Sequence, residues 1–245
     1  MKLARPDIFH PRIVWAGPRN RVPAGDDGLS AALRHRGLNT RWLSWADPQT
    51  AEADLVIVRD IDDYAADLTK FLSWTRSVAN LLNPAEAIAW NLEPGHLDDL
   101  AARGIAVYRL AGGGAGAERS APALARAGRT VLVFVAGEPS HAFERHGAVL
   151  HPSEPEAAIW TLGVAVLSAA ADASGVARNE LLYARTEIIG GASSAQCVEV
   201  NLVAPDLGWA ALDPDARQRA QRRFALGVES ACERLGLGPL SHRRP

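Results

Sequence analysis

The chain has 245 residues, and its 26 basic and 28 acidic side chains give a formal net charge of −2. This near balance gives no sign of a nucleic-acid or membrane surface, and no run of residues approaches the length of a membrane span. The start, MKLARPDIFHPRIVWAG, lacks the apolar core of a signal peptide, and Cys197 and Cys232 have no metal-ligand spacing. We therefore expect a cytoplasmic protein of one large or two small domains.

The N-terminal part of the chain alternates between short apolar runs and segments with helical spacing. Asn83, Pro84 and Glu86 form the cap, first-turn proline and acid that are typical of a helix start. Strand, helix and strand in alternation favour a parallel sheet with crossover helices. Strands are predicted at 12–16, 40–45, 55–59 and 104–110, and helices after Asp26-Asp27, at 70–78, after Asn83 and at 92–102.

The C-terminal part favours an antiparallel sheet. One hairpin is predicted at 130–143, and a second joins 183–189 to 197–203 through Gly190-Gly191.

Two helices are predicted beside these hairpins. Ser153-Glu154-Pro155-Glu156 has the spacing of a capping box before an apolar helix at 157–171. Asp213-Pro214 caps a last amphipathic helix at 215–235.

The second hairpin carries four polar side chains on one side. Residues two apart on a strand face the same way, so Arg185 and Glu187 share a face, as do Glu199 and Asn201. Two carboxylates and an amide oxygen are hard ligands of the kind that hold a divalent cation, and an arginine suits an anion. A solvated polar stripe is the alternative interpretation.

An arginine two residues before an acid, followed twelve residues later by Glu-x-Asn, resembles the C-terminal signature of the ATP-grasp family. The run from Gly137 to His141 resembles the core hairpin of that family. The N-terminal domain of a bacterial group related to glutathione synthetases is similar to segments that include Asp26-Asp27, Val58-Arg59-Asp60 and Trp90-Asn91.

The resemblance implies an α/β fold in two parts. A parallel-sheet pre-ATP-grasp domain would cover residues 1–103, and a reduced ATP-grasp α+β domain with an antiparallel sheet would cover 104–245. It also implies that Glu187, Glu199 and Asn201 hold magnesium on ATP, with Arg185 near an acyl phosphate. The family usually has Asp where this chain has Glu187.

Two ATP-binding features of the family are missing from the sequence. Pro94 stands where the family has a phosphate-binding lysine, and only residues 111–129 stand where it has a lid subdomain with a second lysine. Losing two charged contacts of roughly 1.5–3 kcal/mol each weakens ATP binding by a factor on the order of a thousand. The glycines at 112–116 lack the Gly-Lys-Ser/Thr ending of a phosphate loop and indicate a connector. We therefore expect a truncated, lid-less family member.

These departures leave three hypotheses. We favour an ATP-grasp-derived enzyme that has lost ATP use and performs acid–base chemistry on a small molecule, such as cyclisation, dehydration or isomerisation, in specialised metabolism. The second hypothesis is an ATP- and Mg-dependent carboxylate–amine ligase, and the third is a non-catalytic binding partner.

Under the first hypothesis, Arg185 holds the anionic group of the substrate, and His141, with Glu187 or Glu199, moves protons. The predicted substrate-binding residues are Glu138, Arg145 and Asn201. No cofactor is favoured; magnesium and ATP belong to the ligase hypothesis, with Glu187, Glu199 and Asn201 as metal ligands. The expected partner is a small-molecule substrate rather than a nucleic acid or a membrane, and a homodimer is left open.

Overall fold

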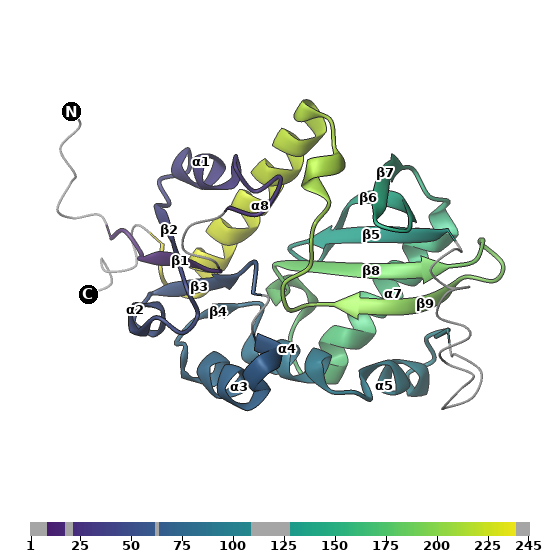
Figure 1. Cartoon of the computed structure of the whole chain (residues 1–245), viewed down its shortest axis with the longest axis horizontal. Coiled ribbons are helices and arrows are strands. Elements are labelled where there is room, and N and C mark those ends of the chain that lie inside the picture. Colours follow the sequence, from purple (N-terminus) through teal and green to yellow (C-terminus); the bar gives the residue numbers. More distant parts are fainter. Residues whose placement is uncertain (1–8, 18–21, 62–63, 109–127, 239–245) are drawn as a thin grey trace.

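The computed structural model describes residues 9–17, 22–61, 64–108 and 128–238. Helices cover two separate sheets that lie side by side (Figure 1). In chain order the elements are β1 (Ile13–Ala16), α1 (Leu29–Arg34), β2 (Thr40–Leu43), α2 (Pro48–Ala51), β3 (Leu55–Val58), η1 (Tyr64–Asp67), α3 (Leu68–Ser77), β4 (Leu81–Leu82), α4 (Ala85–Leu92), α5 (His96–Ala102), β5 (Arg129–Val135), β6 (Glu138–His146), β7 (Val149–Ser153), α7 (Ala157–Ser174), η2 (Arg178–Glu180), β8 (Tyr183–Ile189), β9 (Gln196–Asn201), η3 (Trp209–Ala211) and α8 (Pro214–Arg234).

The first sheet is parallel, with strand order β2-β1-β3-β4. Every residue of β1 and β3 is buried, as expected for strands that are covered on both faces. Trp15 packs on one face with Leu33 of α1 and Phe224 of α8. Val56 packs on the other face with Phe71 of α3. The predicted parallel sheet is confirmed.

The second sheet is antiparallel, with strand order β7-β6-β5-β8-β9. Leu132 and Phe134 lie on the face that α7 covers. Val131 and Val133 point to the opposite face and share a core with residues of α8. This second face also carries the polar side chains of the predicted site, so α8 and the site lie on the same side of the sheet.

Two asparagines join α4 to the second sheet. The Nδ2 of Asn83 donates to the backbone oxygens of Tyr183 at 2.8 Å and Leu202 at 2.7 Å. The Nδ2 of Asn91 donates to the oxygen of Val200 at 2.8 Å, and its Oδ1 accepts from the N–H of Leu202 at 2.7 Å. The predicted Asn83 cap is wrong, because Pro84 occupies the N-cap position of α4 and the Asn83 amide is used across the two sheets.

Two other local predictions need correction. The predicted strand at 104–110 is reduced, within the residues described, to a single bridge between Val107 and Cys197. Glu156, and not Ser153, occupies the N-cap position of α7, and no side-chain hydrogen bond caps that helix. The predicted Asp213 cap of α8 is confirmed, since its Oδ1 accepts from the N–H of Ala216 at 2.8 Å.

In the described part of the chain, α7 alone has the length and hydropathy of a membrane span. Val166, Leu167 and Ala170 are buried in the core between this helix and the second sheet, as in the core helix of a soluble domain. The division of the chain at 103/104 stays a prediction. Across that division, α8 returns from the C-terminal part to pack against α1 (Figure 1).

Candidate functional site

The predicted hairpin forms from β8 and β9, and its turn needs a glycine. Gly190 has a φ of +90°, and a Cβ at this position would lie 2.6 Å from the backbone oxygen of Ser194. In the resulting register Arg185 pairs with Asn201 and Glu187 pairs with Glu199. Cross-strand partners point to the same face of a sheet, so the four polar side chains lie together as the sequence predicts.

The carboxylate of Glu187 is fully buried and is held by three arginines from three strands. Its Oε2 accepts from Nη1 of Arg129 at 2.8 Å. Its Oε1 accepts from Nη1 of Arg145 and from Nη2 of Arg185. Arg129 and Arg145 are cross-strand partners on β5 and β6, and Val131 separates Glu187 from β6. We call Arg129, Arg145, Arg185 and Glu187 the arginine cluster.

The electrostatics of this cluster favour an ionised carboxylate. Burial by itself would raise the pKa of the Glu187 carboxyl, but the hydrogen bond from Arg129 and the charges of Arg185 and Arg145 outweigh burial. The pKa of Glu187 is therefore held below its ordinary value. Three guanidinium groups meet at this carboxylate, and guanidinium groups are suited to bind an anionic ligand.

The two predicted polar residues of β9 differ in their contacts. The Oδ1 of Asn201 accepts a hydrogen bond from the N–H of Val203 at 3.1 Å, so this oxygen already has a partner just after the end of β9. Glu199 is half-buried, and within the described residues its carboxylate has neither a hydrogen bond nor an ion pair. Glu199 is therefore the acid on this face whose oxygens stay available to a ligand.

His141 lies on β6 and is held at both ring nitrogens. Nε2 lies 2.8 Å from the backbone oxygen of Leu207, so it carries the proton, and Nδ1 lies 2.9 Å from Oγ of Ser140. Burial, reinforced by the charge of Arg223, lowers the pKa of His141, although the Leu207 oxygen opposes this shift. Arg185 donates to the neighbouring oxygen of Asp206 at 3.3 Å. His141 and Arg185 thus both bind the backbone of the loop at 206–207. The predicted role of His141 in proton transfer stays a prediction.

Glu138 lies away from the arginine cluster. It pairs with Val135 at one end of the β5–β6 hairpin, whereas Arg145 pairs with Arg129 at the other end, ~20 Å away at about 3.4 Å per residue. Glu138 is exposed and forms an ion pair with Arg178 at 2.9 Å. The structure thus groups Arg145 with Arg185 and Glu187 but places Glu138 elsewhere.

The sequence interpretation missed the contact between Arg129 and Glu187. Arg129 belongs to the shortened segment of 111–129. Residues 111–127 of that segment, with the predicted connector, lie outside the described residues. The alternation of Arg129, Val131 and Val133 along β5 indicates that these three side chains share one face of the strand. Once β5 is known to pair with β8, this face is the one that carries Glu187.

The donor set of the predicted metal site fits magnesium poorly. Both oxygens of Glu187 accept from arginines, and Oδ1 of Asn201 accepts from a backbone N–H. Mg²⁺ needs free oxygen ligands, and three guanidinium groups beside it would repel a dication. No group of three or more His, Cys, Asp or Glu side chains within the described ranges could hold a metal ion.

Comparisons with known proteins agree on the fold. Residues 13–83 match the family model of the N-terminal domain of D-cycloserine synthetase DcsG. A sequence search of curated proteins gives no match. The crystal structure of D-cycloserine synthetase DcsG is similar with a TM-score of 0.70 and 19% identity, over 91% of this chain and 99% of that chain.

Two further solved structures carry nucleotides. D-alanine–D-alanine ligase from Bacillus anthracis, complexed with ATP, is similar with a TM-score of 0.64 and 11% identity, over 93% of this chain and 98% of that one. The ATP-grasp ligase PsnB, complexed with a precursor variant, Mg and ADP, has a TM-score of 0.55 and 14% identity, over 90% and 99%. The fold of the chain is that of the ATP-grasp ligases, and the family resemblance predicted from the sequence is confirmed.

Proposed function

We propose that the chain is a biosynthetic enzyme of the cytoplasm that acts on a small anionic substrate by acid–base chemistry and does not use ATP. The observation that carries this proposal is the capture of both Glu187 oxygens by Arg129, Arg145 and Arg185. The residue that would hold magnesium serves here to align three guanidinium groups. Arginine forks match carboxylates in two-point geometry, so a carboxylate-bearing substrate is the class that the cluster suits.

Arg185 is the member best placed to contact the substrate. Its Nε is buried and has no hydrogen-bond partner within the described residues. A buried donor without a partner is costly, and an acceptor oxygen supplied by a substrate would remove that cost. Glu187 would act as a positioning residue, since its two oxygens fix where the guanidinium groups point.

Glu199 is the proposed proton-moving group. Glu199 lies opposite Glu187 in the register, and its carboxylate has no hydrogen bond or ion pair with the described residues, so it is available to take a proton beside a bound anion. The guanidinium groups would stabilise negative charge that develops on the substrate after the proton leaves. This combination suits cyclisation, dehydration or isomerisation. The likeness to a D-cycloserine synthetase favours a ring-forming step, and a lid-less cleft is part of the proposal.

Calorimetry of the purified chain tests the binding half of this proposal. Malonate is expected to bind saturably, and Arg185→Gln is expected to weaken it about tenfold, as for the loss of one charge-assisted contact. Arg103→Gln is the matched control, because Arg103 is exposed and lies outside the cluster, where it forms an ion pair with Asp99 at 3.6 Å. Equal malonate binding by Arg185→Gln and wild type would remove the proposal.

The ATP- and Mg-dependent ligase is the second candidate, favoured by the shared orientation of Glu187, Glu199 and Asn201. It requires the arginines to release Glu187 when magnesium enters. Titration with magnesium and ATP decides between the two candidates. Saturable binding that Glu199→Gln abolishes, with ADP released when an acid and an amine are present, would establish the ligase. Absence of binding at millimolar ATP would eliminate it.

A further inference from the structure

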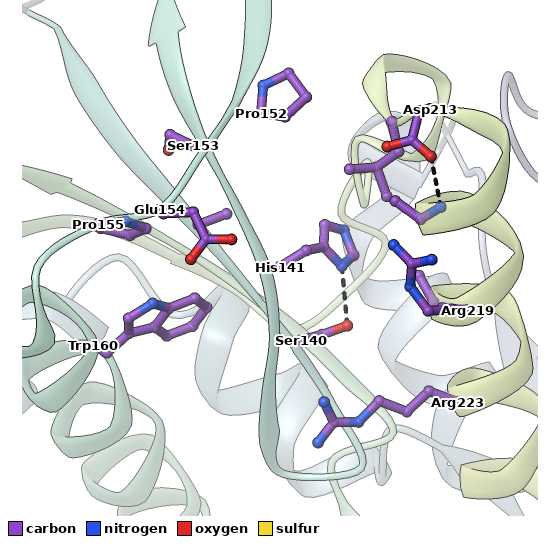
Figure 2. A pocket seen from close by; sticks show the side chains of 14 residues that line it. Ser140, His141, Pro152, Ser153, Glu154, Pro155, Trp160, Asp213, Arg219 and Arg223 are labelled. Carbon is purple, nitrogen blue, oxygen red and sulfur yellow. Dashed lines mark hydrogen bonds between the residues drawn. The ribbon is translucent and has the colours of Figure 1, made fainter.

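We propose that Ser140 and His141 form a nucleophilic dyad that takes the acyl group of an activated ester. Both residues line a pocket of about 670 Å³ that lies between the β6–β7 edge, the start of α7 and one side of α8 (Figure 2). A pocket of this volume accommodates a small molecule. No residue of the arginine cluster lines it, and neither does Glu199, so this activity is separate from the proposed function.

A β-bulge in β6 brings the two side chains together. Neighbouring residues of a regular strand point to opposite faces, so adjacent serine and histidine side chains would not meet. In the register with β5, His141 pairs with Val133, whereas the next residue of β5 pairs with Pro139. Ser140 is therefore the extra residue of a bulge, a feature that turns a side chain from its regular direction and is frequent beside active sites. Its Oγ lies 2.9 Å from Nδ1 of His141 (Figure 2).

The hydrogen bonds of the His141 ring set the direction of proton transfer. Nε2 donates to the backbone oxygen of Leu207 at 2.8 Å, so Nδ1 carries no proton and accepts from the Ser140 hydroxyl. Burial, together with the charge of Arg223, holds the pKa of His141 below its ordinary value, which keeps Nδ1 free of a proton at neutral pH. A hydroxyl bonded to a neutral base that a third group orients is the arrangement of nucleophilic catalysis.

Arg223 supplies positive charge where the reaction develops negative charge. Its Nη1 donates to the backbone oxygen of Pro139, which holds the guanidinium group beside the backbone of Ser140. Arg219 lines the same pocket, and within the described residues neither of these two arginines forms an ion pair with an acid. A guanidinium group without an acid partner is suited to stabilise the oxyanion of a tetrahedral intermediate.

The proposed reaction is the hydrolysis of an ester in two steps. In the first, the Ser140 hydroxyl gives its proton to Nδ1 of His141, Oγ bonds to the carbonyl carbon, and the leaving group departs with that proton. In the second, water gives a proton to Nδ1 and its oxygen bonds to the same carbon. Oγ then recovers the proton from Nδ1 as the carboxylic acid leaves.

The orienting group limits the substrates that this dyad can use. The Leu207 oxygen is neutral, unlike the aspartate of a serine-protease triad, so it stabilises the transient imidazolium less. A phenol or a thiol leaves readily as its anion and needs less help from a protonated histidine. Esters of phenols and thiols are therefore the expected substrate class.

Labelling with diisopropyl fluorophosphate tests the nucleophile, because an activated serine oxygen displaces fluoride from its phosphorus. The tryptic peptide 130–145 contains one serine, Ser140, so mass spectrometry of this peptide identifies the modified residue. Wild type should be labelled there, and His141→Gln should be labelled at least about tenfold more slowly. Ser77→Ala is the matched control, since the Ser77 hydroxyl donates to a backbone oxygen at 2.8 Å, and its labelling should equal that of wild type. An unlabelled Ser140 after prolonged exposure of the wild type would overturn the proposal.

Release of 4-nitrophenol from 4-nitrophenyl acetate tests turnover. Ser140→Ala and His141→Gln should each lower kcat/KM about a hundredfold. Arg223→Gln should lower it about tenfold, because the charge is exposed, and Arg222→Gln should not, because this exposed arginine of α8 does not line the pocket. A full rate in Ser140→Ala would show that histidine alone hydrolyses the ester and would refute the role of Ser140. Malonate should bind Ser140→Ala as it binds wild type, which separates this site from the arginine cluster.

Discussion

Removing the Glu187 charge is the sharpest test of the arginine cluster. In Glu187→Gln the side chain keeps its size and one acceptor oxygen, but three guanidinium groups lose the carboxylate that they share. Breaking a buried charge pair by removing one partner costs about 3–5 kcal/mol. The arginine side chains are 14–31% exposed and can turn partly toward water. We therefore expect a loss of about 2–4 kcal/mol in the free energy of unfolding.

Urea unfolding followed by circular dichroism measures this loss, with Glu138→Gln as the matched control. Glu138 also contacts an arginine, but its side chain is 55% exposed, and an exposed pair contributes at most about 1 kcal/mol. If Glu187→Gln destabilises the protein no more than Glu138→Gln does, Glu187 is not the centre of a buried charge cluster.

The pH dependence of the same difference has a defined sign. The folded pKa of Glu187 lies below the ordinary value of 4.5, so its stabilisation is fully present above that pH and is lost as the pH falls through the folded pKa. The gap in unfolding free energy between wild type and Glu187→Gln should be constant from pH 7 down to about pH 5 and should narrow below that. A gap that widens toward acid pH would contradict the arginine contacts.

Three further predictions concern groups outside the arginine cluster. Asn91→Ala removes one hydrogen bond to β9 and one to Leu202, which follows that strand, and should lower the unfolding free energy by about 2–3 kcal/mol in urea titrations. A loss below about 0.5 kcal/mol would show that these bonds do not hold α4 in solution. Asp213→Ala should cost about 1 kcal/mol, read from the same titrations, because α8 loses its N-cap; an unchanged midpoint would refute the cap. Burial raises the pKa of Cys197 to about 12 and that of Cys232 to about 11, so mass spectrometry should find neither alkylated by iodoacetamide at pH 8 until urea unfolds the chain, and rapid native labelling of Cys197 would contradict its burial.

The sequence predicts those features whose cause is local. The β8–β9 hairpin follows from alternation and two glycines, and the α8 cap follows from Asp213-Pro214; both are confirmed. The Asn83 cap was predicted from equally local signals, yet the Asn83 amide donates to residues a hundred or more positions away. A helix cap depends only on residues of the same helix. The partners that the Asn83 amide has instead come close to it only when the two sheets lie side by side.

The arginine cluster also depends on a feature that the sequence does not predict, namely the order of the strands in the sheet. Alternation fixes the face on which Arg129, Arg145 and Arg185 point, and strand order decides whether they meet. Sequence alone does not place β5 between β6 and β8, and that placement brings three cations onto one carboxylate. Glu138 lies away from these arginines for a related reason. It is at the turn end of the β5–β6 hairpin and Arg145 is near the open end, so the two side chains are far apart although they are close in sequence.

The charge count on this face argues against a simple transfer of the ligase mechanism. A magnesium-dependent site concentrates acids around a dication, whereas here β5, β6 and β8 each contribute an arginine and β8 also contributes the buried acid Glu187. Guanidinium groups are planar and weakly hydrated, so three of them can surround one carboxylate where three ammonium groups would each demand water. Under the proposed function, Glu187 therefore anchors the guanidinium groups of an anion site and does not hold a metal ion. Within the described residues Glu199 has no hydrogen bond or ion pair, so the proposed function assigns proton transfer beside a bound anion to this acid.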